Sequence, residues 1–157
     1  MSYDLIFVPR SDDQSWEEAL EAAEEAAEED DDDLPSGEVW ARLLAAARHV
    51  LGEVSVFEGA YNYELTHEST GIQLSYYSRE AGITVPYWYR AEGAKAIVKS
   101  IYQLGEAVEE VTGLPGFDPQ LDLPLSDAVA QSELAARVFD EVAASFAKQG
   151  INSPSNS

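Results

Sequence analysis

The side chains that most often carry reactions in proteins are scarce in this chain, which has two histidines and no cysteine. His67 is the candidate for proton transfer, within Thr66-His67-Glu68-Ser69, which we expect to form a turn between strands. Catalytic triads assemble across a fold, but the sequence contains no Gly-x-Ser-x-Gly turn and no His-Glu-x-x-His motif. We therefore expect no catalytic residues and a protein that is not an enzyme.

A run of six acids, Glu28 to Asp33, is the obvious candidate for binding cations. It lacks the spacing of a calcium loop, in which acidic residues alternate with others before a glycine and a later glutamate. The absence of cysteine excludes zinc–thiolate sites, and no glycine-rich phosphate-binding loop is present. We expect neither a metal nor a cofactor, and we expect residues 28–33 to be disordered because their like charges repel.

The net charge of -21 narrows the classes of partner. Direct binding to nucleic acid is not expected, because contacts to phosphates need lysine and arginine. Anionic membrane surfaces are disfavoured for the same reason. A basic protein is the natural partner, since complementary charge speeds encounter, although acidity can also serve solubility alone.

Hydrophobic periodicity predicts the helices and strands on which these side chains stand. Residues 1–150 are predicted to form one α+β domain, a small antiparallel sheet packed with about four helices, followed by a disordered tail at 151–157. We expect strands at 3–8, 54–57, 61–65, 71–77 and 83–89, and the last two of these form a hairpin. Pro86 suggests an edge position or a bulge.

Helical stripes are expected at 16–28, 39–51 and 94–112, with Ser15 and Glu18 forming a capping box for the first. Residues 114–125 contain three prolines and are expected to be a loop. Ser126 is then expected to cap a final helix that Gly150 ends. The buried row of this helix is predicted to be Leu134, Val138, Val142 and Phe146, with Phe139 beside it.

Aromatic residues are concentrated in the sheet region. Adjacent residues of a strand point to opposite faces, so Tyr76 and Tyr77 cannot both lie in a core on one side of the sheet. Helices covering both faces would explain the pattern, and the four expected helices favour this reading. The other reading is an exposed aromatic face ready for a partner. The expected contact residues are Asp30, Asp31, Asp32, Asp33, Glu58, Glu64 and Glu68, with Tyr77 and Trp88 as anchors.

Location is predicted from the start of the chain and from hydropathy. Residues 1–9 lack the basic region of a signal peptide and resemble a first strand. No segment approaches the roughly 18 apolar residues of a membrane helix. The lack of cysteine fits a reducing compartment, so we expect a cytoplasmic protein.

Four short segments carry a family resemblance: Ser2-Tyr3-Asp4-Leu5, Gly71-Ile72-Gln73-Leu74, the strand from Ile83 to Trp88, and Thr112-Gly113-Leu114 followed by Phe117-Asp118-Pro119-Gln120. Over roughly residues 1–125 the chain resembles small acidic uncharacterised bacterial proteins of actinobacterial type, several of which resemble immunity proteins of secreted polymorphic toxins. The resemblance implies a cytoplasmic, non-enzymatic protein that binds a toxin and covers its active site. It supplies no catalytic residues.

Charge, aromatic residues and this resemblance lead to the hypothesis of a protein-binding inhibitor of immunity type, which neutralises a basic, toxin-like protein. A DNA mimic that occupies nucleic-acid-binding proteins is the first alternative. A small-ligand binder or enzyme with an unrecognised site in the sheet is the second alternative.

Overall fold

A seven-stranded antiparallel sheet organises the chain, and the computed structural model describes residues 2–29 and 35–148. The strands follow the order β2-β3-β4-β5-β1-β6-β7 across the sheet. Their bounds are β1 Ser2–Phe7, β2 Ser55–Glu58, β3 Tyr63–His67, β4 Ile72–Tyr76, β5 Ala81–Pro86, β6 Gly116–Asp118 and β7 Leu123–Pro124. The helices are α1 Trp16–Glu29, α2 Gly37–Leu51, α3 Ala91–Thr112, α4 Leu125–Ala128 and α5 Ser132–Lys148, with a 3-10 turn at Val129–Gln131. The expected α+β class with a small antiparallel sheet is confirmed.

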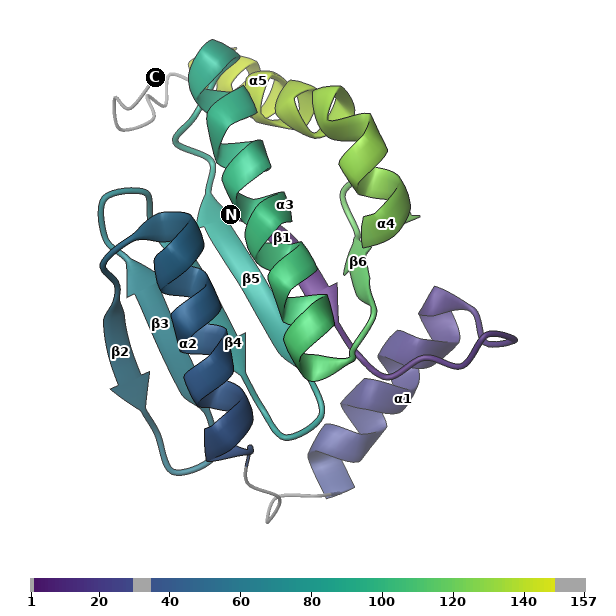
Figure 1. Ribbon diagram of the computed structural model, residues 1–157. Coiled ribbons are helices and arrows are strands. Elements are labelled where there is room, and N and C mark those ends of the chain that lie inside the picture. Colours follow the sequence, from purple (N-terminus) through teal and green to yellow (C-terminus); the bar gives the residue numbers. More distant parts are fainter. Residues whose placement is uncertain (1, 30–34, 149–157) are drawn as a thin grey trace.

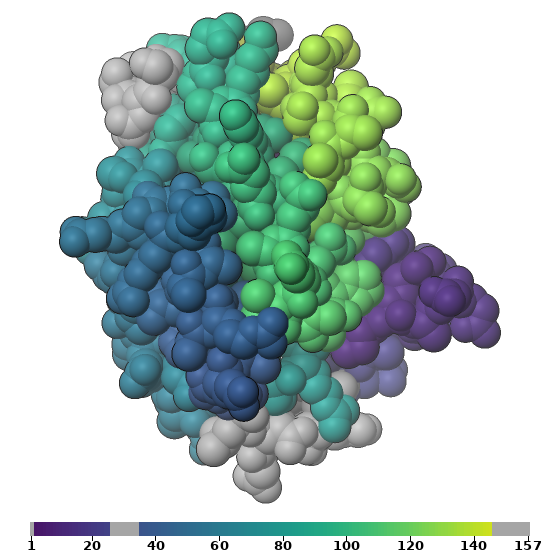
Figure 2. Space-filling model, viewed as in Figure 1, coloured from purple at the N-terminus to yellow at the C-terminus, as the bar shows by residue number. Residues whose placement is uncertain are grey.

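Helices α2, α3 and α5 lie on one face of this sheet (Figure 1). Alternate strand residues point toward them and are buried, such as Leu5 of β1, Leu74 of β4 and Ile83 of β5. The ring of Trp40 in α2 stacks on Tyr63 of β3 with centroids 5.1 Å apart, and Phe139 of α5 stacks on Tyr3 at the same distance. Seen from this side, the side chains of α2 and α3 meet in a continuous layer (Figure 2).

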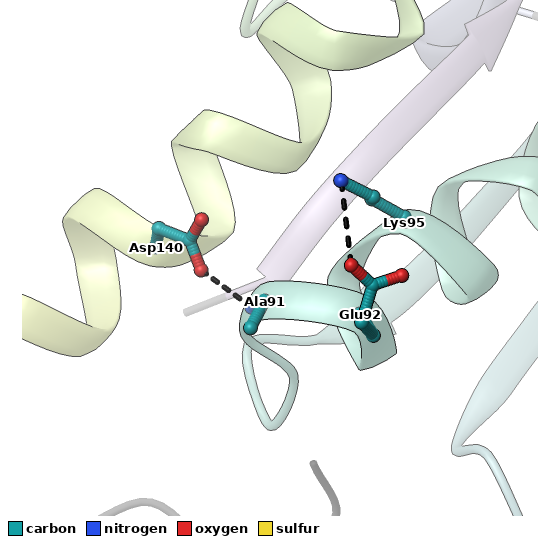
Figure 3. A network of polar contacts seen from close by, with 4 residues as sticks. All are labelled: Ala91, Glu92, Lys95 and Asp140. Atoms are coloured by element: carbon teal, nitrogen blue, oxygen red, sulfur yellow. Dashed lines mark hydrogen bonds and ion pairs between the residues drawn. The ribbon is translucent and has the colours of Figure 1, made fainter.

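The start of α3 is held by a residue of α5. Arg90 occupies the N-cap position without a capping side-chain bond, and Ala91 has a positive φ of 53°. Asp140 Oδ1 accepts a 2.7 Å hydrogen bond from the Ala91 amide (Figure 3). This carboxylate satisfies one of the free N–H groups at the positive end of the helix. Asp140 therefore caps the N-terminus of α3, although it belongs to a different helix.

Two predictions for the C-terminal part of the chain are wrong. The expected loop at 114–125 contains β6 and β7, and Ile6 of the central strand β1 pairs with Phe117. The expected helix capped by Ser126 is divided into α4, a 3-10 turn and α5. In α5 the fully buried residues include Phe139 and Ala135, while Leu134 is exposed.

Two further expectations need correction. Pro86 is the last residue of β5, an interior strand between β4 and β1, where it pairs with Ser2. A proline is tolerated there because the ladder ends at that pair. Helix α1 continues to Glu29, so Glu28 and Glu29 are helical rather than disordered. The rest of the acidic run and the expected tail at 151–157 lie outside the described residues. No helix in the described part of the chain is long and apolar enough to cross a membrane.

Candidate functional site

The face of the sheet opposite α2, α3 and α5 carries a row of polar residues. The pairing register places Ser55, Thr66, Gln73, Thr84 and Asp4 side by side across five strands. Thr84 donates a 2.7 Å hydrogen bond to Asp4 Oδ1, and Gln73 Nε2 lies 3.3 Å from Thr66 Oγ1. All five residues are partly or fully exposed. The sheet therefore has one apolar face, which α2, α3 and α5 cover, and an opposite face that is polar and accessible along this row; we call the opposite face the open face.

Aromatic and acidic side chains meet at one end of this open face. Phe57 of β2 is paired with Glu64 of β3 and is 59% exposed. Tyr77 follows β4 and is also exposed. Partial burial, followed by the negative charges of Glu64 and Glu80, raises the pKa of Tyr77. Burial, followed by the charge of Glu24 in α1, raises the pKa of Glu80. We call Phe57, Glu64, Tyr77, Glu80 and Glu24 the acidic–aromatic patch.

Helix α1 adds a second acidic surface. At about 100° per residue, the glutamates between Glu17 and Glu25 fall within an arc of about 120°. All five of them are exposed: Glu17, Glu18, Glu21, Glu24 and Glu25. Ala19 on the opposite side is buried, and the ring of Trp16 stacks on Phe117 of β6 with centroids 4.9 Å apart. Phe117 pairs with Ile6, so its ring lies on the face opposite Leu5 and Phe7, and the apolar side of α1 packs on the β6 part of that open face while its glutamates face outward.

Basic residues are sparse on the elements that carry these surfaces, although Arg10 lies over the Trp16 ring at 5.1 Å and Arg79 lies in the turn between Tyr77 and Glu80. Neither α1 nor any of the seven strands contains lysine or arginine. Helices α2, α3 and α5 each contain at least two basic residues: Arg42, Arg48, Lys95, Lys99, Arg137 and Lys148. Carboxylates outnumber basic residues on α1 and on the strands, so the potential over α1 and the open face is negative. A cationic surface is complementary to that side.

The histidine considered for catalysis belongs to a turn. His67 Nδ1 lies 2.6 Å from Thr70 Oγ1, and its Nε2 lies 3.3 Å from Ser69 Oγ. Tyr89 donates a 2.6 Å hydrogen bond to the carbonyl oxygen of Thr70. Gly71 ends the turn with a φ of 81°, a conformation that glycine adopts without strain. These contacts show that the His67 side chain stabilises the β3–β4 turn. Its ring nitrogens contact the hydroxyl groups of Thr70 and Ser69, and neither contacts a carboxylate within the described part of the chain.

The structure brings some of the expected contact residues together and separates others. Glu64 and Tyr77 lie in the acidic–aromatic patch, and Glu58 is exposed on β2. Glu68 accepts a 2.9 Å hydrogen bond from Ser55. Trp88 is half-buried beside Gly71, at the opposite end of the β4–β5 hairpin from Tyr77. The two expected anchors therefore do not form one site.

Asp30, Asp31, Asp32 and Asp33 lie outside the described residues. Phe57, Glu80 and Glu24 were missing from the expected set. Adjacent residues of β2 point to opposite faces of the sheet, so Val56 and Phe57 cannot both be buried on one side. This alternation could have identified Phe57 as an exposed aromatic residue. The proximity of Glu24 to Glu80 depends on how α1 docks, for which the sequence carries no local signal.

Among the described residues, no group of three or more histidine, aspartate or glutamate side chains is arranged to hold a metal ion. Comparisons with family models, with curated proteins and with solved structures gave no significant match for this chain.

Proposed function

We propose that this chain is a non-enzymatic inhibitor of immunity type, which binds a basic, toxin-like protein in the bacterial cytoplasm. The observation that carries the proposal is the acidic–aromatic patch, where Phe57 and Tyr77 are exposed beside Glu64 and Glu80. Large exposed aromatic side chains are favoured anchors at protein interfaces. Carboxylates around them select a cationic partner.

Binding then proceeds in two physical steps. The glutamates of α1 and the open face attract a positively charged protein over roughly a Debye length of about 8–10 Å. Phe57 and Tyr77 lose their exposed area against the partner, which slows dissociation. A partner whose active site is a basic groove is blocked when that groove is occupied by these carboxylates.

The experiment compares capture by the immobilised full chain with capture by two variants. The Phe57→Ser/Glu64→Gln double variant removes an anchor and a charge from the patch. The control is Glu106→Gln, which makes the same charge change at an exposed site of α3, on the helix-covered side. We expect the wild type and the control to capture one stoichiometric basic protein from the native host, and the double variant to lose it.

The captured protein is then expressed with each version of the chain. The wild type and Glu106→Gln should restore growth, and the double variant should not. The proposal is overturned if no protein is captured, if all three versions capture equally, or if growth is unaffected by the captured protein.

One observation also favours the DNA-mimic alternative. The five exposed glutamates of α1 follow one another along the helix axis in steps of about 1.5, 4.5, 4.5 and 1.5 Å, and the mean of about 3 Å is close to the 3.4 Å per phosphate of one DNA strand. A mimic should compete with duplex DNA for several unrelated basic proteins. An inhibitor of immunity type should bind one partner at a salt concentration that releases the others.

A further inference from the structure

The two edges of the sheet are protected to different degrees. Strand β7 has two residues, one of which is Pro124, and α4 follows it directly. Strand β2 has four consecutive exposed residues, without lysine or proline, and pairs with β3 without a bulge. Proteins usually block exposed edges with such residues or with bulges, because an open edge invites another strand. Edge β2 is therefore available for pairing.

The register shows which backbone groups of β2 are unpaired. Gly59 N–H donates a 2.8 Å hydrogen bond to Asn62 O. Hydrogen-bonded pairs alternate with non-bonded pairs along an antiparallel ladder. Phe57 and Ser55 therefore bond inward to β3, whereas Val56 and Glu58 direct their N–H and C=O groups away from the sheet.

Charge decides what can occupy this edge. Acidic side chains lie on and around β2, namely Glu53, Glu58, Glu64 and Glu68. A second copy of the chain would bring the same carboxylates against one another, with a net charge of -21 on each molecule. An extended cationic segment meets no such repulsion, and its alternate side chains would lie beside Phe57 on the open face.

We propose that β2 accepts an extended, lysine- or arginine-rich segment of the partner protein as an eighth antiparallel strand. The inference rests on the proposed function and specifies how the partner docks. Main-chain hydrogen bonds from Val56 and Glu58 hold the segment, and the acidic–aromatic patch selects its side chains. The exposed Val56 and Phe57, at 39% and 59%, become covered.

The test uses the full chain and a synthetic peptide of about eight alternating lysines and valines. We expect the amide hydrogens of Val56 and Glu58 to exchange about tenfold more slowly at peptide saturation, measured by NMR. A peptide of the same sequence that is N-methylated at every residue keeps the charge but has no N–H group on either edge and cannot complete the ladder. It should not slow exchange at these two amides.

Val56→Pro supplies the matched variant, because it removes an outward N–H without removing a hydrogen bond to β3. Val56→Thr keeps the N–H and a similar shape, and serves as the control. Val56→Pro should bind the peptide about tenfold more weakly than Val56→Thr, with thermal melting used to verify that both are folded. If Val56→Pro does not fold, the exchange measurement on the wild type decides.

Unchanged exchange at Val56 and Glu58, or equal affinity of the two folded variants, would overturn strand addition. The proposed function would survive that result if capture of the native partner still depended on Phe57 and Glu64. If no native partner were captured, the proposed function would be overturned, whether or not the peptide binds β2.

Discussion

The hydroxyl group of Tyr102 lies 2.7 Å from Asp118 Oδ2 and donates a hydrogen bond that joins the middle of α3 to β6. Tyr3 of the central strand β1 donates to the same oxygen. Oδ1 accepts from the backbone amides of Gln120 and Leu121 and from the Gln120 side chain. Asp118 is fully buried, so its carboxylate is a junction between the helix layer, the central strand and the loop after β6.

Asp118→Asn should destabilise the protein by about 2–4 kcal/mol. The amide that replaces the carboxylate supplies one acceptor oxygen in place of two and loses the charge that strengthens all five hydrogen bonds. Urea unfolding measures the change. The same substitution at the exposed Asp127 should alter stability by less than about 0.5 kcal/mol. Equal effects at the two positions would show that the junction does not stabilise the fold.

Stability should fall steeply above about pH 10. Burial is the largest cause that raises the pKa of Tyr3, Tyr102 and Tyr87. The pKa of Tyr87 is raised to about 12. The folded state therefore holds these protons more tightly than the unfolded chain. Their contribution to the free energy of unfolding is complete below about pH 10, and it is lost as the pH rises through the pKa values of the folded state. Each tyrosine should account for about 1.4 kcal/mol per pH unit between about pH 10 and 12.

Tyr87→Phe isolates one of these contributions. Within residues 2–29 and 35–148 the Tyr87 hydroxyl group makes no hydrogen bond to a side chain, and its ring centroid lies 5.1 Å from that of Phe139. The variant should keep near-wild-type stability at pH 7 and show an alkaline slope smaller by about 1.4 kcal/mol per pH unit. Urea unfolding at about pH 9, 10.5 and 11.5 gives both slopes. Parallel curves would exclude Tyr87 as a source of the pH dependence.

Elements that are specified by residues close in sequence were predicted, whereas those that depend on residues far apart in sequence were missed. Periodicity predicted the stripes of α2 and α3 and the β4–β5 hairpin, because each is specified by residues close in sequence. It missed β6, which has three residues near prolines and pairs with a strand more than 100 residues earlier. Asp118 belongs to one of the four segments that carry the family resemblance, but its donors Tyr3 and Tyr102 come from distant elements.

The candidate site shows the same division. Alternation in β3 and β4 could place Glu64 and Tyr77 on one face. The two expected anchors lie apart, because Tyr77 follows β4 beside the hairpin turn, whereas Trp88 follows the end of β5 beside Gly71. Helices were expected to cover both faces, and they do so unequally: α2, α3 and α5 gather on one face, whereas α1 packs on Phe117 at the β6 part of the other.

Asp140→Ala should cost about 1–2 kcal/mol of stability, because the Ala91 amide at the start of α3 loses its acceptor. Asp140→Asn keeps an acceptor oxygen without the charge, so its cost should lie between those of the wild type and the alanine variant. Urea unfolding gives the order. Glu141→Ala, at the adjacent exposed position of α5, is the control and should change stability by less than about 0.5 kcal/mol. Equal costs at both positions would contradict capping by Asp140.

Glu80→Gln should stabilise the free protein at pH 7. Burial, and then the charge of Glu24, raises the pKa of Glu80, so the folded state disfavours its carboxylate. The penalty is complete above the folded pKa and disappears as pH falls below the unfolded value of about 4.3. We expect a gain of up to about 1 kcal/mol near pH 7 and none near pH 3, from urea unfolding at both values.

The same substitution should weaken binding to the cationic partner, because it removes a carboxylate from the acidic–aromatic patch. A substitution that raises stability and lowers affinity is expected where a charged residue serves recognition and not folding. Glu106→Gln, outside the patch, should leave binding unchanged. If Glu80→Gln bound the partner as the wild type does, Glu80 would have no role in recognition, and a loss of stability would show that its carboxylate stabilises the fold.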